Sequence, residues 1–422
     1  MRTFSALLFV MFALSANAAD GTVGTVSVQK GNNVSVNGEA PLSLTLDGKG
    51  HQSCQFLSKR APDESHEFTW KEVTTTRGGE LAEILGDQLR SVDSLVVKGY
   101  VNDKDFHAMW DASLYGYLSV INLKNAVLEN NAVPDTAFFH ENEQYEGSSH
   151  EIFYYIGLRK IILPEGLEKI GEGAFYQASA LRQVNFPSTL RYIGDFAFNA
   201  TKLEMNQLVI PEGVEEINQY AFAFCRKLKA QVTLPSTIKK IGEWAFYGCP
   251  ITSINLPEGL ESLGSLAFWD CYLREVSIPS SCHEFNEGWQ FGFNRNLEKM
   301  HLPEGMTEIP DHFAVDCFRL REVNFPHTLK HIGEKAFSLC ISLKNVDLPL
   351  GMQSLGEEAF SELEALEQIV FPASMKSLGK NSCSYWKNIK RIYCAAMEPP
   401  VCDPTDGGVF SGFDFPDGLN TP

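Results

Sequence analysis

One pattern, LxxVxLPxxLxxIGxxAF, recurs about every 23 residues from Leu158 onward and limits the folds open to this chain more than any other feature. It is clearest in Leu181–Phe198, which reads LRQVNFPSTLRYIGDFAF. One unit of this length cannot close a hydrophobic core, but stacked copies bury a continuous apolar column and extend one parallel sheet. The pattern therefore predicts a repeat solenoid. Its ten copies are marked by Pro164, Pro187, Pro211, Pro235, Pro257, Pro279, Pro303, Pro326, Pro349 and Pro372.

Each part of the pattern has a physical role. An apolar residue stands three positions before each proline and another directly before it, which predicts a short strand with one buried face. Proline ends this strand because it has no N–H for a further ladder bond. The usually aliphatic residue six positions beyond proline tends to be followed by Gly, which we interpret as permitting a tight reversal. The Phe eleven positions beyond is expected to plug the core in seven copies: Phe175, Phe198, Phe222, Phe246, Phe268, Phe337 and Phe360.

The residues after proline alternate between two types, which indicates duplication of a two-repeat unit. Odd-numbered copies carry Glu-Gly or Leu-Gly, as in Glu165-Gly166 and Leu350-Gly351. Even-numbered copies carry mainly Ser and Thr, as in Ser188-Thr189. A structural explanation suffices, because two turn chemistries can serve the same bend.

These residues resemble the BspA-type leucine-rich-repeat family, whose repeat has the form seen in Leu320–Cys340, LREVNFPHTLKHIGEKAFSLC. The resemblance covers at least Leu158–Asn388. Gly78–Phe106 and Ile121–Phe139 look like the divergent leading segment of such proteins, and Ile392–Phe410 resembles their closing segment. The resemblance implies a secreted or surface protein of host-associated anaerobic bacteria, some of which act as adhesins. It does not identify a ligand.

The expected fold is an α/β-type leucine-rich-repeat solenoid. Its parallel sheet should line the concave face, with short strands and irregular or short helical turns elsewhere. The expected organisation is a signal peptide at 1–18, a β-rich module or cap at 19–77, divergent leading repeats at 78–157, ten repeats at 158–388, and a C-terminal capping segment at 389–422. The chain ends at Pro422, where another strand is expected.

The N-terminus has the features of a secretory signal. Arg2 is its only charge, Ala6–Leu14 form an apolar stretch, and Ala16-Asn17-Ala18 is a cleavage site that would leave Ala19 first. Nothing downstream has the length and apolarity of a membrane-spanning helix. The net charge of −18 and the lack of a Lys/Arg run argue against a nucleic-acid partner. We therefore expect a secreted or cell-surface protein.

The cysteines divide into two groups. Five hold nearly equivalent places after the Ala-Phe pair, and in-register side chains of a parallel array point the same way, so buried free thiols are predicted there. Those five are Cys225, Cys249, Cys271, Cys317 and Cys340. Cys394 and Cys402 flank a Pro-Pro bend and are the candidate disulfide, whereas Cys54 has no evident partner.

Catalytic motifs are not evident, so the chain is not predicted to be an enzyme, and no cofactor or metal is expected. Ser236 and Lys239 match SxxK, and His327 and His331 have i,i+4 spacing, but repeat positions account for both pairs. An enzyme would require a cluster of polar groups in residues 19–157.

Binding is expected at outward positions of the strands, because adjacent repeats place equivalent residues side by side. The polar rows two and four residues before proline favour a hydrogen-bonded contact with protein or glycan, although an unused solvated face would look the same. The candidate strip contains Gln183, Asn185, Gln207, Gln231, Thr233, Asn255, Glu275, His301, Glu322, Asn324, Asn345 and Asp347. The sixth copy departs from the pattern, and Trp289 and Phe291 there either form an aromatic docking site or repack the interior.

The predicted function is that of a secreted or cell-surface interaction protein, adhesin-like, which binds host matrix or plasma proteins or neighbouring cells through the concave face. The alternative is a surface glycan-binding protein for nutrient capture. That alternative predicts clustered exposed Trp and Tyr side chains rather than a strip of Asn and Gln.

Overall fold

The computed structural model describes the backbone of residues 26–29, 33–36, 42–46 and 52–56, and the backbone and side chains of residues 67–139, 156–402 and 408–411. The predicted signal peptide and the Cys54 side chain lie outside the described residues. The chain divides into two compact units. The first unit is Met1–Met205 with Phe224–Lys227, and the second is Asn206–Ala223 with Leu228–Pro422.

A small antiparallel sheet lies near the N-terminus of the first unit, in the region predicted to be β-rich. Its strand order is β2-β1-β4-β3. The strands are β1 (Val26–Gln29), β2 (Asn33–Val36), β3 (Leu42–Leu46) and β4 (Gln52–Phe56).

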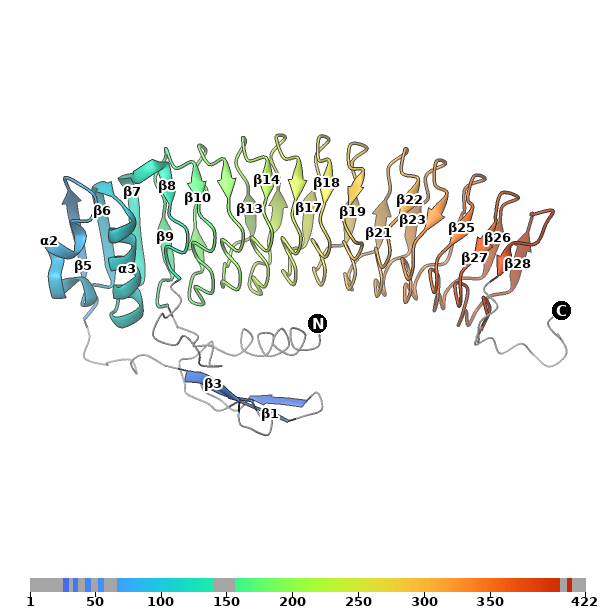
Figure 1. The fold of residues 1–422 in the computed structure, drawn as a ribbon, viewed down its shortest axis with the longest axis horizontal. Coiled ribbons are helices and arrows are strands. Elements are labelled where there is room, and N and C mark those ends of the chain that lie inside the picture. Colours follow the sequence, from blue (N-terminus) through green and yellow to red (C-terminus); the bar gives the residue numbers. More distant parts are fainter. Residues whose placement is uncertain are drawn as a thin grey trace. The chain divides into compact units, whose positions relative to one another are not determined.

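The leading segment of the first unit carries longer strands and the helices. Its elements are β5 (Trp70–Thr75), α2 (Leu81–Leu85), η1 (Gly86–Arg90), β6 (Ser94–Val101), α3 (Asp103–Tyr115), β7 (Val120–Leu128) and η2 (Glu129–Asn131). Strands β5, β6 and β7 are parallel neighbours, and β7 pairs with the first repeat strand. Figure 1 shows α2 and α3 beside these strands at the blue end. The parallel sheet thus begins at Trp70, before the boundary predicted at residue 78.

Each repeat forms one coil, which carries two short strands in every copy but the ninth, and residues 156–402 contain no helix. The first-row strands precede the repeat prolines, as predicted, in every copy except the ninth, where residues 345–347 form no strand. In the first unit they are β9 (Lys160–Ile162) and β11 (Gln183–Val184). In the second unit they are β13 (Gln207–Val209), β15 (Gln231–Thr233), β17 (Ser253–Asn255), β19 (Glu275–Ser277), β21 (Lys299–His301), β23 (Glu322–Asn324) and β26 (Gln368–Phe371), followed by β28 (Arg391–Cys394).

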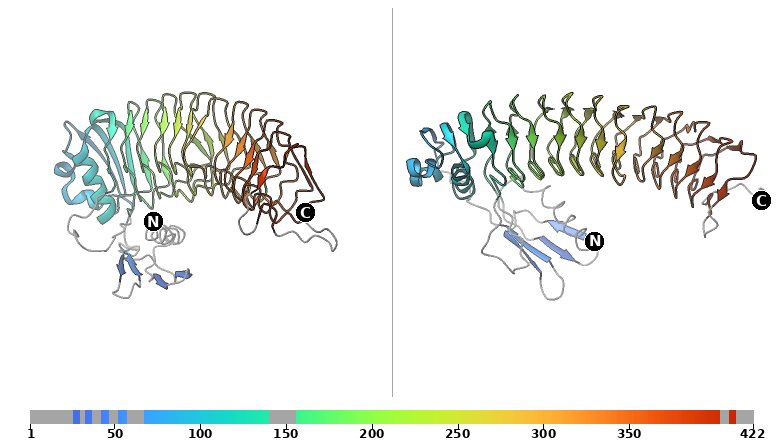
Figure 2. Two further views of the ribbon diagram at one scale, coloured as in Figure 1. Left: turned by 45° about the vertical axis from the view of Figure 1, so that its right-hand side comes forward. Right: turned by 45° about the horizontal axis from the view of Figure 1, so that its top comes forward.

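The second-row strands surround the aliphatic residue beyond proline, where the sequence predicted only turns. In the first unit β8 (Ala132–Val133), β10 (Lys169–Ile170) and β12 (Tyr192–Ile193) pair in parallel. In the second unit the row contains β14 (Glu216–Ile217), β16 (Lys240–Ile241), β18 (Ser262–Leu263), β20 (Glu284–Phe285), β22 (Glu308–Ile309), β24 (His331–Ile332), β25 (Ser354–Leu355), β27 (Ser377–Leu378) and β29 (Val401–Cys402). Figure 2 shows the strand arrows of successive coils side by side within the second unit.

The predicted phenylalanine core is confirmed, because all seven rings are fully buried. In the second unit the rings of Phe222, Phe246 and Phe268 stack with centroids 5.3 and 5.6 Å apart and nearly parallel planes. Each ring therefore covers the face of the ring in the next coil, which gives the array its continuous column.

The sixth copy keeps this column despite its irregular sequence. Phe291 is fully buried and stacks on Phe268 at 5.6 Å, so of the two alternatives predicted for this residue the structure supports repacking of the interior and not a docking site. Phe291 stands one position further from its proline than the other core rings. Glu287 and Gly288 take up this extra residue in positive-φ conformations (49° and 79°). The insertion therefore leaves the core intact.

The Gly after the second-row strand serves close packing rather than a tight reversal. A Cβ on Gly264 would lie 2.5 Å from the backbone nitrogen of Glu243, and a Cβ on Gly242 would lie 2.8 Å from that of Gln219. Neither residue has a left-handed φ. Our interpretation of this position was wrong, because the constraint comes from the preceding coil and not from the turn.

The buried free thiols are confirmed at all five predicted cysteines. In the second unit, the thiol of Cys249 donates to the carbonyl of Phe222 at 2.8 Å and that of Cys271 donates to Phe246 at 3.3 Å. Asn294 takes this role in the sixth copy, where Nδ2 donates to Phe268 at 2.7 Å. The cysteines therefore satisfy backbone carbonyls of the preceding coil. Burial raises the pKa of Cys317 to about 12, so it remains a thiol.

The predicted disulfide between Cys394 and Cys402 is not formed, because both are free, exposed cysteines. Cys394 ends β28 and is in register with Phe371, whereas Cys402 ends β29 and is in register with Leu378. The two strands belong to different sheets. The Pro-Pro bend therefore separates the cysteines into two rows instead of joining them.

The alternating residues after proline form a clamp between paired coils. Glu258 accepts hydrogen bonds from the Ser280 hydroxyl and backbone N–H, at 3.1 and 3.3 Å. The Gly259 N–H donates to the Ser281 hydroxyl at 2.9 Å, and that hydroxyl donates to the Leu260 carbonyl at 2.7 Å. Equivalent clamps begin at Glu165, Glu212 and Glu304. The two-repeat period thus has a structural cause.

Candidate functional site

Outward side chains of three neighbouring strands form an uncharged, exposed surface in the second unit. Strands β13, β15 and β17 are parallel and in register, and their outward residues are all exposed. Among the described residues, no group bonds to the side chains of Gln207, Gln231, Thr233, Ser253 and Asn255. We call this surface, completed by Val209, the amide patch. It contains four residues of the predicted strip.

The next three strands of the strip are charged and largely satisfied internally. Lys299 pairs with Glu322 at 3.2 Å, and His301 lies 3.3 Å from Glu275. The strands β19, β21 and β23 place these side chains in register. This stretch therefore offers fewer unsatisfied groups to a partner than the amide patch does.

Two predicted binding residues, Asn185 and Asn324, instead form hydrogen bonds with the backbone of the preceding coil. In the first unit the Asn185 side chain accepts from the Leu163 N–H at 2.7 Å and donates to its carbonyl at 3.0 Å. Asn324 brackets Leu302 in the same way in the second unit, at 2.8 and 2.9 Å. Their amides are thus committed to the fold. Asn345 and Asp347 are exposed but lie in the ninth copy, outside any strand.

A second surface, which the sequence prediction largely missed, lies on the turns after the second-row strands. In the second unit, Tyr220 stacks on Trp244 at 5.2 Å, and Trp289 stacks on His312 at 3.7 Å. Trp269 contacts both Trp289 and Phe293, at 5.2 and 4.5 Å. These six residues are half-buried, and we call them the aromatic band. Only Trp289 was a predicted site residue.

Four members of the band share one position in the coil. This turn position follows the second-row strand and is occupied by Tyr220, Trp244, Leu266, Trp289, His312, Lys335, Glu358 and Asn381. All eight residues have left-handed backbone conformations, with φ between 51° and 66°. Large side chains are uncommon there because the Cβ crowds the backbone.

Burial keeps two ionisable members of the band in their neutral forms. It lowers the pKa of His312, and the nearby Glu334 carboxylate offsets part of this effect. It raises the pKa of Tyr220, to which Glu243 also contributes. At neutral pH the band therefore consists of uncharged rings.

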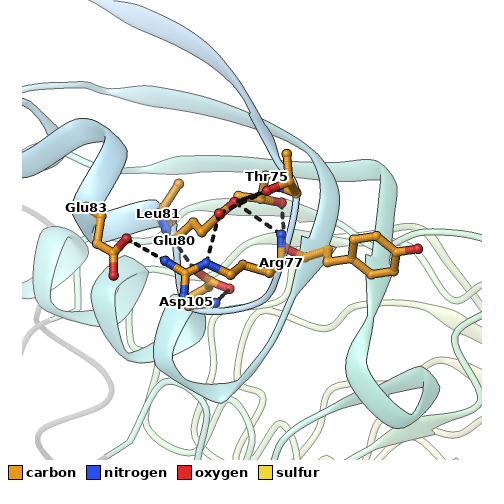
Figure 3. A network of polar contacts seen from close by, with 9 residues as sticks. Thr75, Arg77, Glu80, Leu81, Glu83 and Asp105 are labelled. Carbon is orange, nitrogen blue, oxygen red and sulfur yellow. Dashed lines mark hydrogen bonds and ion pairs between the residues drawn. The ribbon is translucent and has the colours of Figure 1, made fainter.

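The acidic side chains of the leading segment are committed to structure. Glu80 accepts from the backbone N–H groups of Thr76 and Arg77, at 2.6 and 3.1 Å, and these bonds lower its pKa to about 2. The buried Asp105 carboxylate accepts from the N–H groups of Gly79 and Leu81, at 2.7 and 2.9 Å (Figure 3). This network fixes the β5–α2 loop against the start of α3.

The weak catalytic candidates bind separate partners. Ser236 donates to Glu212 at 3.0 Å within a clamp, whereas Lys239 pairs with Glu261 at 3.2 Å. His327 contacts Glu304, and His331 contacts the Ser354 hydroxyl at 2.7 Å. Neither pair converges on a common point.

Within the described part of the chain, no group of three or more His, Cys, Asp or Glu side chains is arranged to hold a metal ion. No described helix combines the length and apolarity that crossing a membrane requires.

Comparison with known protein families identifies the repeats. The family described as "BspA type Leucine rich repeat region" matches residues 148–231, 229–338 and 312–397, in six copies. These matches span more than half of the chain. A comparison with curated proteins gives no significant match.

One solved structure supports the fold, and a second is reported beside it. A leucine-rich repeat protein from Bacteroides ovatus is 21% identical, with 88% of this chain and 92% of that chain covered and a TM-score of 0.52. A leucine rich cell surface protein from Faecalibacterium prausnitzii is 16% identical, with 88% and 95% covered and a TM-score of 0.35. At 21% identity, the similarity to the Bacteroides ovatus protein supports the leucine-rich-repeat fold but does not indicate a ligand or an activity for this chain.

Proposed function

Because the chain belongs to the BspA-type leucine-rich-repeat family, we propose that it is a secreted or cell-surface interaction protein that binds another protein through the amide patch. The proposal includes export through the predicted signal peptide. Host matrix proteins, plasma proteins and proteins of neighbouring cells are the proposed partners.

The observation that supports this proposal is the unsatisfied state of the patch. Gln207, Gln231 and Thr233 are exposed on in-register strands and have no bonding partner among the described residues. The charged stretch that begins at β19 has paired its own side chains instead. A surface with free donors and acceptors gains more from a partner than one whose groups already bind each other.

The chemistry of the amide patch suits binding to another protein. A side-chain amide both donates and accepts, and so matches the N–H and C=O groups that another protein presents. The lack of charge on the patch removes the desolvation penalty that buried ions would bring. Val209 adds an apolar contact within the polar surface.

The proposal is tested by measuring binding of the chain from Ala19 to an array of matrix and plasma proteins, followed by substitution of the patch. Gln231→Glu places a charge at the centre of three uncharged strands, so we expect a captured protein to bind about tenfold more weakly. Gln368→Glu is the matched control, because it makes the same change at the equivalent position of β26, where Gln368 already accepts from Arg391 at 2.9 Å.

The control should bind like the wild type. Equal weakening by both substitutions would show that the contact lies elsewhere or that net charge alone is responsible. Failure of the wild type to bind any protein on the array would overturn the proposal.

A further inference from the structure

The aromatic band carries large side chains at a backbone position that disfavours them. Tyr220, Trp244 and Trp289 have φ of 55°, 56° and 66°, where Gly or Asn would be less strained. Strained positions persist where the surrounding structure enforces them, and they gather at binding sites. The turn imposes this conformation in other coils too, with φ of 51° at Lys335 and 52° at Glu358, so what calls for explanation is the benefit of placing a ring there rather than a polar side chain.

Closure of the turn does not supply that benefit. The backbone N–H of Trp244 donates to the Ser265 carbonyl at 2.9 Å, and the backbone N–H of Lys335 makes the equivalent bond to the Glu357 carbonyl at 2.8 Å. Glu358 and Asn381 hold the same position in later coils with φ of 52° and 51°. Polar residues thus close the same turn equally well, and the rings are confined to some of the coils.

The Trp269 ring can pack where it does only because the residue beneath it in the next coil, Gly292, has no side chain. A Cβ on Gly292 would lie only 2.1 Å from the Trp269 ring, so this ring lies directly over the backbone of the next coil. Trp269 in turn contacts Trp289 and Phe293. Trp269, Trp289 and Phe293 therefore form one cluster across two neighbouring coils, whereas Tyr220 and Trp244 form a separate pair.

The stacking of the rings leaves fewer open faces for a cationic ligand. Tyr220 and Trp244 are stacked within 15° of parallel, and Trp289 and His312 within 9°. A cation binds over a ring face, but in each of these pairs one face of each ring is covered by its neighbour. Ring edges carry the positive side of the quadrupole and favour oxygen acceptors instead.

Polar groups alternate with the rings. No described residue accepts from the indole N–H groups of Trp244, Trp269 and Trp289, and none of these groups is both buried and unsatisfied. The carboxylates of Glu243 and Asp311 belong to the same turns. Hydroxyl groups can accept from the indoles and donate to the carboxylates, while sugar C–H groups pack on apolar carbon.

From this arrangement we propose that the aromatic band binds a neutral, linear glycan lying across successive coils. The flanking carboxylates would repel a sulfated or uronic acid chain, which restricts the ligand to uncharged sugars. The site differs from the amide patch, so the chain would carry separate surfaces for protein and for glycan.

Calorimetric titration of the chain from Ala19 with cellohexaose, maltohexaose and mannohexaose tests the proposal, with hexalysine as the cationic probe. We expect at least one hexasaccharide to bind and hexalysine to leave the band unoccupied. Trp244→Asn and Trp289→Lys should each weaken that glycan about tenfold. Both substitutions introduce residue types that the chain itself carries at this turn position, so the variants should fold, as circular dichroism will verify.

Lys335→Asn is the matched control, because it changes the same turn position outside the band and should leave glycan affinity unchanged. Absence of binding by all three glycans would overturn the proposal. So would glycan binding that survives both tryptophan substitutions, or hexalysine binding that both abolish. Loss of protein binding in Gln231→Glu has no bearing on this site, which keeps the two tests separate.

Discussion

In the second unit, a positive-φ backbone serves opposite purposes in two kinds of turn: the turn after proline in the coils that carry Glu-Gly, and the turn after the second-row strand. In the turn after proline, Gly213, Gly259 and Gly305 adopt it with φ of 97°, 109° and 99°, and the neighbouring side chains clamp the next coil. In the turn after the second-row strand, residues such as Trp244 adopt it at a cost of about 1–3 kcal/mol. The clamp turn uses its side chains for the fold, whereas the aromatic turn presents them at the surface.

The contrast separates structural from functional repeat positions without reference to other sequences. A side chain whose partners all lie in the adjacent coil, such as Ser281, is explained by the stack. A side chain that strains the backbone, or that has no partner among the described residues, such as Gln231, is not. Periodicity alone does not distinguish them, because both kinds recur with the repeat.

The largest effect is expected from Gly264→Ala, at the start of the turn that carries Leu266. The new Cβ would lie 2.5 Å from the backbone nitrogen of Glu243, and backbone cannot move aside as a side-chain end can. We expect a loss of about 3 kcal/mol of unfolding free energy, measured by urea denaturation with circular dichroism. If Gly264→Ala unfolded at the same urea concentration as the wild type, the close approach of adjacent coils at this glycine would be contradicted.

Gly259→Ala, five residues earlier in the clamp turn, should cost less. The nearest atom to its Cβ would be the Ser236 carbonyl oxygen at 3.7 Å, an ordinary contact, so only the φ of 109° opposes the change. The expected loss is about 1–2 kcal/mol in the same urea experiment. A larger loss than that of Gly264→Ala would reverse the comparison, because backbone strain would then outweigh close packing.

Ser281→Ala tests the clamp without altering the backbone. It removes the acceptor for the Gly259 N–H and the donor to the Leu260 carbonyl. Water can replace part of this bonding at a half-buried site, so about 1 kcal/mol should be lost. Ser277→Ala, at an exposed outward position of β19, is the control and should leave the urea midpoint unchanged.

The sequence predicted the features that depend on local pattern. The alternation before each proline located the first-row strands, because an apolar residue such as Val232 must face the core when its neighbours face water. The repeated Phe located the core column for the same reason. The ten copies and the buried thiols followed from the spacing of these residues.

The features that the sequence did not reveal depend on contacts between coils. Trp244 and Tyr220 are separated by a whole repeat, and only stacking brings their rings to 5.2 Å. The requirement for Gly264 comes from a backbone atom in the preceding coil. The hydrogen bond that the Asn324 side chain accepts from the Leu302 N–H also joins two coils, so the sequence of one strand could not predict it. For Phe291, the one-residue insertion moved the core position past the expected place.

The smallest predicted effect concerns the one clamp in which His327 replaces Ser. Hydrogen bonds from the His327 side chain and backbone N–H hold the pKa of Glu304 below its ordinary value of 4.5. Because the folded pKa is the lower one, this clamp contributes fully above the unfolded pKa and loses its contribution as the pH falls through the folded value. The urea midpoint of the wild type should therefore approach that of Glu304→Gln as the pH drops from about 5 to about 3. Taking the difference between the two proteins cancels the titration of all other groups. A difference that stays constant over this range would mean that the Glu304 carboxylate adds nothing to the clamp beyond what a neutral amide supplies.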